Sequence, residues 1–155
     1  MSGPLEALVG TWAGSGRGFY PTITAFGYTE EVTFTAVAGK PFLAYTQRTR
    51  HATEDRPLHA ESGYWRWVDE DRRLEVVMAH PTGIAEILEG DLLVVDGGLD
   101  LVLESSSIAL TATAKEVRAT RRRFELRGDE LRYSVAMAAV GQPLQEHLEA
   151  ELHRR

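Results

Sequence analysis

The sequence predicts an all-β protein, an antiparallel up-and-down barrel of about ten strands with at most a few short helices. Two observations carry this prediction. Short stretches in which apolar and polar residues alternate recur from Leu8 to the C-terminus, and a period of two is typical of strands. Turn-forming residues separate these stretches at the spacing that an antiparallel meander requires. Closing the sheet would pair every strand edge and could enclose a ligand.

The expected strands follow one another along the chain. The alternating stretches occupy residues 31–35, 41–49, 63–68, 74–79 and 84–88, and turn residues occupy 38–40, 69–71, 81–83 and 96–98. Gly128-Asp129, between residues 122–126 and 131–137, indicates a hairpin whose two arms contain β-branched or aromatic residues. This hairpin is the clearest local signal in the sequence.

The last stretch, residues 143–152, is ambiguous. Leu144, Leu148 and Leu152 recur at every fourth position, which fits the stripe of a helix and also places all three on one side of a strand. The pattern alone favours a helix.

Length and composition are typical of one globular domain that spans residues 1–155. The absence of cysteine excludes disulfides, thiolate metal sites and a cysteine nucleophile. A net charge of −6 argues against a nucleic-acid surface, and there is no apolar run of the roughly 18 residues that a membrane helix needs. The first residues lack the features of a secretory leader, so the expected location is the cytoplasm. No G-x-S-x-G hydrolase motif occurs.

The most unusual segment is residues 10–23, where glycine takes every second position from Gly14 to Gly18. Glycine inside a strand marks a bulge, a sharp bend or the close approach of another group. Barrel curvature is the favoured interpretation, contact with a ligand is the alternative, and Trp12 is expected to fill the core. A phosphate-binding loop is disfavoured, because no lysine and no helix follow the glycines.

This segment resembles the signature of the nitrobindin family, G-x-W-x-G-x-G followed shortly by Y-P-T. The match comprises Gly10, Trp12, Gly14, Gly16 and the sequence Tyr20-Pro21-Thr22. Further matching segments are residues 28–32, 39–43, 114–116 and 141–148, so the resemblance extends over nearly the whole chain. It implies a ten-stranded barrel shaped like the fatty-acid-binding proteins, with one ferric haem b in one mouth.

The resemblance also implies roles for individual residues. The histidine of the Q-P-x-x-x-H-L pattern is the family's axial iron ligand, and it corresponds to His147, which would be both the metal ligand and the catalytic residue. Thr22 matches a threonine beside the haem, and Lys115 lies in a matched Ala-Lys-Glu pattern and could pair with a haem propionate. The glycine motif, with Gly10, Trp12, Gly14 and Gly16, is assigned to haem binding as well.

Five histidines could carry metal chemistry: His51, His59, His80, His147 and His153. Only His147 has the family context, and His80 is a conceivable distal residue. The family's last segment is a strand, so the resemblance overrides the helix that the leucine spacing favours. On a strand, however, His147 would share its face with the polar residues 145, 149, 151 and 153 rather than with the leucines. A β-bulge, or a haem held at the barrel rim, would resolve this conflict.

Two functions of different classes follow. The resemblance implies an enzyme that isomerises peroxynitrite to nitrate at its haem iron and binds nitric oxide. Its oligomeric state, monomer or homodimer, stays open. The alternative is a carrier of a fatty acid or another apolar ligand, because a fold alone does not define a function. A carrier needs no histidine at position 147 and usually offers inward arginines to a carboxylate, and no arginine in this sequence has a clear inward assignment.

Overall fold

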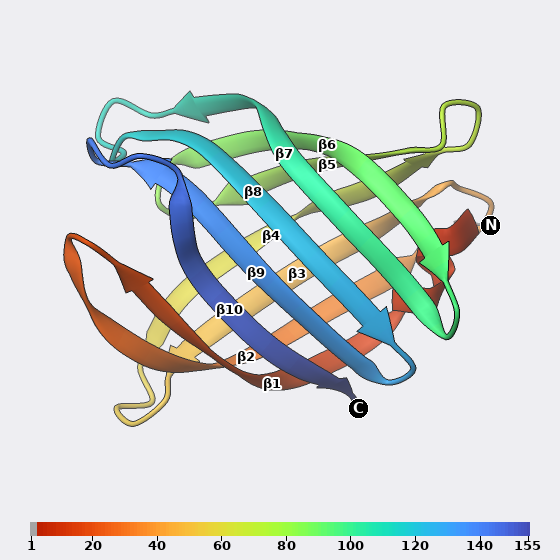
Figure 1. The fold of residues 1–155 in the computed structure, drawn as a ribbon, viewed down its shortest axis with the longest axis horizontal. Helices are drawn as coiled ribbons and strands as arrows, with labels where there is room; N and C mark the ends of the chain where they lie inside the picture. The colour runs from red at the N-terminus through yellow and green to blue at the C-terminus, as the bar shows by residue number, and fades with distance from the viewer. Residues whose placement is uncertain (1–2) are drawn as a thin grey trace.

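The computed structural model describes residues 3–155, and over this range it is a closed antiparallel barrel of ten strands preceded by one short 3₁₀ helix (Figure 1). The predicted fold class is confirmed. The elements are η1 (Gly3–Leu8), β1 (Gly10–Tyr20), β2 (Ile23–Ala36), β3 (Phe42–His51), β4 (Pro57–Val68), β5 (Arg73–His80), β6 (Ile84–Val95), β7 (Gly98–Leu110), β8 (Val117–Arg127), β9 (Glu130–Ala139) and β10 (Gln145–Arg154). Each strand pairs with its neighbours in sequence, and β1 closes the barrel on β10.

The predicted strands and turns lie where the alternation placed them, including the β8–β9 hairpin around Gly128. The helix favoured for residues 143–152 is wrong, because β10 pairs with β9 on one side and with β1 on the other. Those two ladders satisfy the backbone groups of β10, and this tertiary pairing outweighs the four-residue spacing of its leucines.

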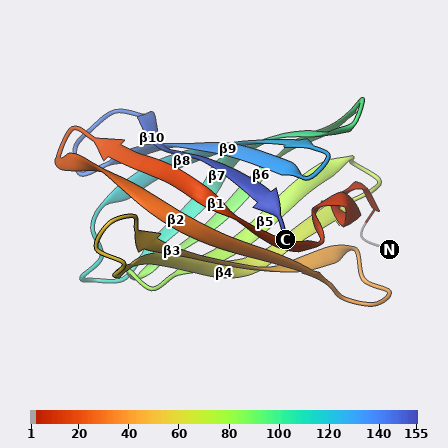
Figure 2. The same cartoon turned by 90° about the horizontal axis from the view of Figure 1, so that it is seen from below.

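Helix η1 covers one end of the barrel, next to the start of β1 and the end of β10 (Figure 2). Leu5 and Leu8 are fully buried, and the Nε1–H of Trp12 donates a 2.9 Å hydrogen bond to the carbonyl oxygen of Leu8. The Arg154 guanidinium lies over the Trp12 ring. The helix therefore plugs this end with apolar side chains that the first strand holds in place.

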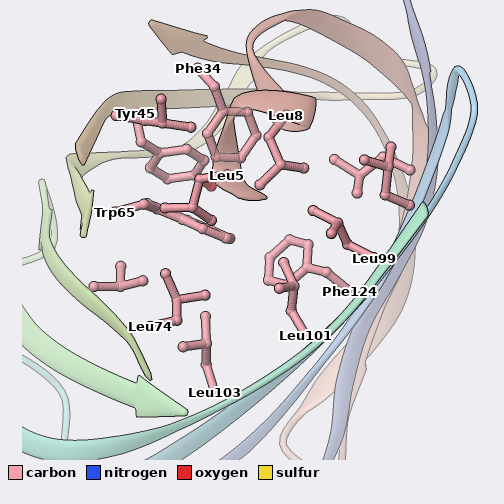
Figure 3. Close-up of a cluster of buried hydrophobic side chains, with 14 of the residues drawn as sticks. Leu5, Leu8, Phe34, Tyr45, Trp65, Leu74, Leu99, Leu101, Leu103 and Phe124 are labelled. Carbon is pink, nitrogen blue, oxygen red and sulfur yellow. The ribbon is translucent and has the colours of Figure 1, made fainter. Parts of the chain in front are cut away.

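An apolar core fills the barrel next to this plug (Figure 3). Along each strand every second side chain points inward, as a pleated sheet requires. Trp65 lies at the centre, with the rings of Phe34, Tyr45 and Phe124 within 5.0 to 5.6 Å of its own. Among residues 3–155 no helix is long and apolar enough to cross a membrane.

Candidate functional site

The opposite end of the barrel, at the left of Figure 1, carries the candidate site. Here β1, β3, β5, β7 and β9 end and the other strands begin. We call this end the mouth. His147 enters it from β10, whereas His59 on β4 and His80 on β5 belong to the opposite wall, since those strands are four to six positions away around the barrel.

A β-bulge sets the direction of His147. The β9–β10 register passes from Glu146 to Leu148 without a partner for His147. Strand β1, which pairs with the other edge of β10, is irregular as well: its pairing with β2 shifts between Gly18 and Tyr20, at Phe19. An extra residue turns the side chains of a strand relative to the pleat, and this resolves the conflict between His147 and the polar face of its strand.

The two irregular residues contact each other, and the contact fixes the imidazole. Nδ1 of His147 lies 2.9 Å from the carbonyl oxygen of Phe19, and the Tyr20 ring packs edge-on against the imidazole at 5.3 Å. A carbonyl oxygen only accepts, so Nδ1 carries the hydrogen and Nε2 of the neutral ring has a free lone pair. Tyr20 is itself anchored, because its hydroxyl donates to the Met137 carbonyl and accepts from the Ala139 N–H.

The electrostatics of His147 favour the form that binds a metal. Burial lowers the pKa of His147 below 6.5. The hydrogen bond to Phe19 opposes this effect, and a positive charge on His59 across the mouth would add to it. A neutral imidazole with one nitrogen held by a carbonyl is the usual state of a haem or zinc ligand. The residues at position 147 and around it therefore fit an iron ligand.

The other predicted site residues separate into two groups. Thr22, in the β1–β2 turn, and Lys115, in the β7–β8 loop, are exposed at the same mouth as His147. Gly10 and Trp12 are at the start of β1, at the plugged end. The structure thus brings Thr22 and Lys115 to the end that carries His147, and it leaves Gly10 and Trp12 at the other.

Gly14 and Gly16 give the chain room for its own packing. A Cβ atom on Gly14 would lie 2.0 Å from the carbonyl oxygen of Glu151 on β10, and one on Gly16 would lie 2.6 Å from the Tyr28 ring. These contacts agree with the favoured interpretation, in which the glycines permit tight curvature and close approach.

Below the mouth lies a layer of buried charged and polar residues that the sequence analysis did not identify. The Arg122 guanidinium donates to both carboxylate oxygens of Glu61, at 2.8 and 2.9 Å, and to Glu86 at 3.0 Å. Burial by itself raises the pKa of both carboxyl groups, but Arg122 and the hydrogen bonds from neighbouring side chains outweigh it and hold both pKa values below 4.5. We call Glu61, Glu86 and Arg122 the charged triad.

Arg122 points into the barrel, although from the sequence alone no arginine has a clear inward assignment. The residue points into the barrel because it has the parity of Phe124 and Leu126, whereas Arg123 has the opposite parity and is exposed. The same signal, a charged residue on the apolar face of its strand, marks Glu61 and Glu86. Arg122 is nevertheless committed to two carboxylates, so it does not offer a free charge to a fatty acid.

A second buried acid lies beside the triad. Glu30 accepts hydrogen bonds from the Tyr133 hydroxyl and from Nε2 of Gln47, each at 2.7 Å, and the Tyr28 and Tyr133 hydroxyls lie 2.8 Å apart. Burial raises the pKa of Glu30, and the hydrogen bonds from Tyr133 and Gln47 lower it by less, so the pKa is about 7. Unlike the triad carboxylates, Glu30 takes up a proton near neutrality.

The interior cavity beside these residues has a volume of about 50 Å³, and its lining includes Glu30, Gln47 and Arg122. Small-molecule pockets usually measure roughly 300–1,000 Å³, and a volume of this size suits a water molecule or two. A cavity of this volume is too small for a fatty acid or a macrocycle. The mouth, where His147 lies, is the end of the barrel at which a larger cofactor would be accommodated.

Comparison with known proteins gives one consistent result. Residues 1–154 match the family model described as "THAP4-like, heme-binding beta-barrel domain". The chain is 57% identical over 151 residues to peroxynitrite isomerase 1 of Mycolicibacterium paratuberculosis, covering 97% of this chain and 92% of the relative. It is 51% identical to the peroxynitrite isomerase of Nocardia farcinica, covering 97% and 88%.

Solved structures agree with the fold. The crystal structure of Rv2717c from M. tuberculosis superposes with a TM-score of 0.92 at 51% identity and covers 99% of this chain and 98% of that one. The S-type phycobiliprotein lyase CPES from Guillardia theta superposes with a TM-score of 0.68 at 13% identity, covering 97% and 90%. That second likeness concerns the fold alone.

Proposed function

The chain belongs to the family of THAP4-like, haem-binding β-barrel domains, the nitrobindin family, and on that premise we propose that it is a peroxynitrite isomerase whose single haem b is ligated by His147. The identity of 51 to 57% to relatives with this activity, over nearly the whole chain, supports the reaction. A bound ferric haem would supply an iron centre at which peroxynitrite rearranges to nitrate.

One observation carries the assignment of His147. It is the bulged residue of β10, its Nδ1 is held by the Phe19 carbonyl, and its Nε2 keeps a lone pair for a metal. The carbonyl and the Tyr20 ring fix the direction of the imidazole, and burial keeps it unprotonated. An axial ligand needs these properties, because a freely rotating or protonated imidazole binds iron poorly.

The remaining residues of the mouth have supporting roles in this proposal. Thr22 and Lys115, which are exposed at the same end, would bind the haem propionates through a hydroxyl hydrogen bond and a point charge. With His147 as its one protein ligand, the haem iron would also be able to bind nitric oxide. Because the plug closes the far end of the barrel, small molecules would reach the haem only through the mouth.

Adding haemin to the purified protein tests the assignment. We expect a ferric Soret band with one haem per chain and faster peroxynitrite decay in a stopped-flow assay. The substitution His147→Ala should abolish both and leave the β-sheet circular dichroism unchanged, because it removes the iron bond and no large core side chain. His153→Ala, at an exposed position, is the control and should behave as the wild type. A His147→Ala protein with the wild-type ferric spectrum would show that another residue binds the iron.

A further inference from the structure

Across the barrel from His147, three side chains from two neighbouring strands converge on one point. His59 and Glu61 project inward from β4 and His80 from β5. Nε2 of His59 lies 3.1 Å from Nδ1 of His80, and these two nitrogens lie 3.9 and 3.4 Å from Oε2 of Glu61. Each side chain thus offers one ligand atom to a single point.

We propose that His59, His80 and Glu61 form a second metal site, which takes one divalent transition ion of the Zn²⁺ type in addition to any haem. Two imidazoles and one carboxylate are the ligands of zinc sites that keep an open coordination position. Zinc–nitrogen and zinc–oxygen distances of about 2.0–2.2 Å in a tetrahedron separate two ligand atoms by roughly 3.3–3.6 Å. The three observed separations lie around that range before any ion draws the ligands together.

The contact of His80 with Glu86 is the arrangement that metal-binding histidines usually have. Nε2 of His80 lies 2.9 Å from Oε1 of Glu86, and a carboxylate only accepts, so Nε2 carries the hydrogen. The lone pair of the neutral ring is then on Nδ1, where it accepts the hydrogen bond from Nε2 of His59. A metal ion would take the place of that hydrogen, with His59 carrying its hydrogen on Nδ1 instead. A carboxylate behind a ligating imidazole fixes its tautomer and raises its basicity.

Glu61 can serve as a ligand although it pairs with Arg122. Its Oε1 accepts from Tyr45 and from Arg122, whereas Oε2 accepts only one hydrogen bond from Arg122. The second lone pair of Oε2 is on the side of the two imidazoles. The guanidinium repels a cation and so weakens the site, but it also holds the carboxylate in the ligating position.

The negative charge of this region favours a cation. Glu61 and Glu86 carry two negative charges and Arg122 one positive charge, and the three side chains are buried. With neutral imidazoles the cluster has a net charge of −1, and an uncompensated buried charge is costly. A divalent ion between the imidazoles would change the net charge of these side chains from −1 to +1, and an ionised Glu30 in the same polar layer would bring it to zero. It would enter through the mouth, where His59 is partly exposed.

Isothermal titration of Zn²⁺ into the full chain tests this proposal. Haemin is present so that His147 is engaged, and a His147→Ala chain serves as a parallel arm. We expect one Zn²⁺ per chain in both arms, with zinc-edge X-ray absorption showing two imidazole ligands. Glu86→Gln should weaken binding by roughly 10- to 100-fold, and His59→Gln and His80→Gln should weaken it further. His59→Gln leaves the contact between His80 and Glu86 intact, so this variant should still fold. Thermal melting verifies that it does.

Two control variants locate the ion. His153→Gln alters a second group of potential ligands, Glu130, Glu151 and His153, on the exposed face, and His51→Gln alters an exposed contact within the β3–β4 turn. Both should bind Zn²⁺ as the wild type does. The proposal is overturned if the wild type gives no saturable heat, if a folded His59→Gln chain binds as tightly as the wild type, or if His153→Gln alone loses the ion.

Discussion

The two halves of the barrel interior are stabilised in different ways. At the plugged end, Leu5, Leu8, Trp12 and their neighbours exclude water mainly by apolar packing. Toward the mouth, the charged triad and the Glu30 cluster replace the apolar side chains with hydrogen-bonded charges. Apolar packing tolerates the loss of one member at the cost of a cavity, whereas a buried charge that loses its partner has nothing else to bind. The half that carries the chemistry is thus the half that is more sensitive to substitution.

Removal of Arg122 should have the largest effect on stability. Arg122→Leu leaves Glu61 and Glu86 buried without their cation, and we expect the free energy of unfolding to fall by about 3–5 kcal/mol in denaturant titrations. Arg123→Leu, one position away on the exposed side, should change it by less than about 0.5 kcal/mol. Equal effects of the two substitutions would contradict the idea that the polar half depends on its ion pairs.

Truncation of the plug should lower the free energy of unfolding slightly less than removal of Arg122 does, and it should leave haem binding at the mouth unchanged. Leu8→Ala leaves a cavity in a fully buried position, and we expect a loss of about 3 kcal/mol in the free energy of unfolding. Leu144→Ala, at a residue that is 43% exposed near the mouth, is the matched control and should be close to neutral. Haem affinity should be the same in both variants. A weaker affinity in Leu8→Ala would show that the two halves are coupled.

The pH dependence of stability should distinguish Glu30 from the triad. Its pKa is about 7 in the folded state and 4.5 when unfolded, so the folded state binds more protons between these values. The contribution of Glu30 to the free energy of unfolding therefore falls as the pH rises, by on the order of 2 kcal/mol between pH 5 and pH 8. The lowered pKa of His147 acts in the opposite direction, because acid favours the unfolded state.

The difference between wild type and Glu30→Gln isolates this contribution, since both proteins retain His147. Denaturant titrations at pH 5, 6.5 and 8 should give a difference that changes with pH in the stated direction. A constant difference would mean that Glu30 keeps the same ionisation state in the folded and unfolded chains.

The exposed residues of the mouth should matter least. Thr22→Ala and Lys115→Ala remove groups that solvent already screens, so each should lower haem affinity by less than about fivefold, with little effect on melting temperature. Haemin titrations monitored at the Soret band provide the measurement. A loss comparable to that of His147→Ala would give these residues a larger share of the binding than their exposure implies.

The sequence predicted the strands better than it predicted the interior. Alternation and turn residues are local signals, so the hairpin at Gly128 and the strands around residues 63–68 and 74–79 could be located from the sequence. The last strand could not, because the spacing of Leu144, Leu148 and Leu152 fits two structures, and only pairing with β1 and β9 decides between them. The bulge at His147 is also a product of that pairing.

The candidate site was predicted in part for the same reason. A motif indicated His147, whereas the contact between His59 and His80 joins residues 21 positions apart and that between Glu61 and Arg122 joins residues 61 positions apart. Strand parity indicates that such residues point inward, but not which of them meet. Register across several strands determines that, and it depends on the closed barrel as a whole.

The seam between β1 and β10 joins the two ends of the polypeptide, and Arg154 donates a hydrogen bond to the carbonyl of Ala7, 147 positions earlier. Such a distant pairing forms late, because most of the chain must be ordered before its ends meet. Phe19 and His147 face each other across this same seam. The orientation of His147 that we propose for iron binding therefore exists only once β1 and β10 have paired, so a barrel that is still open at this seam would lack it.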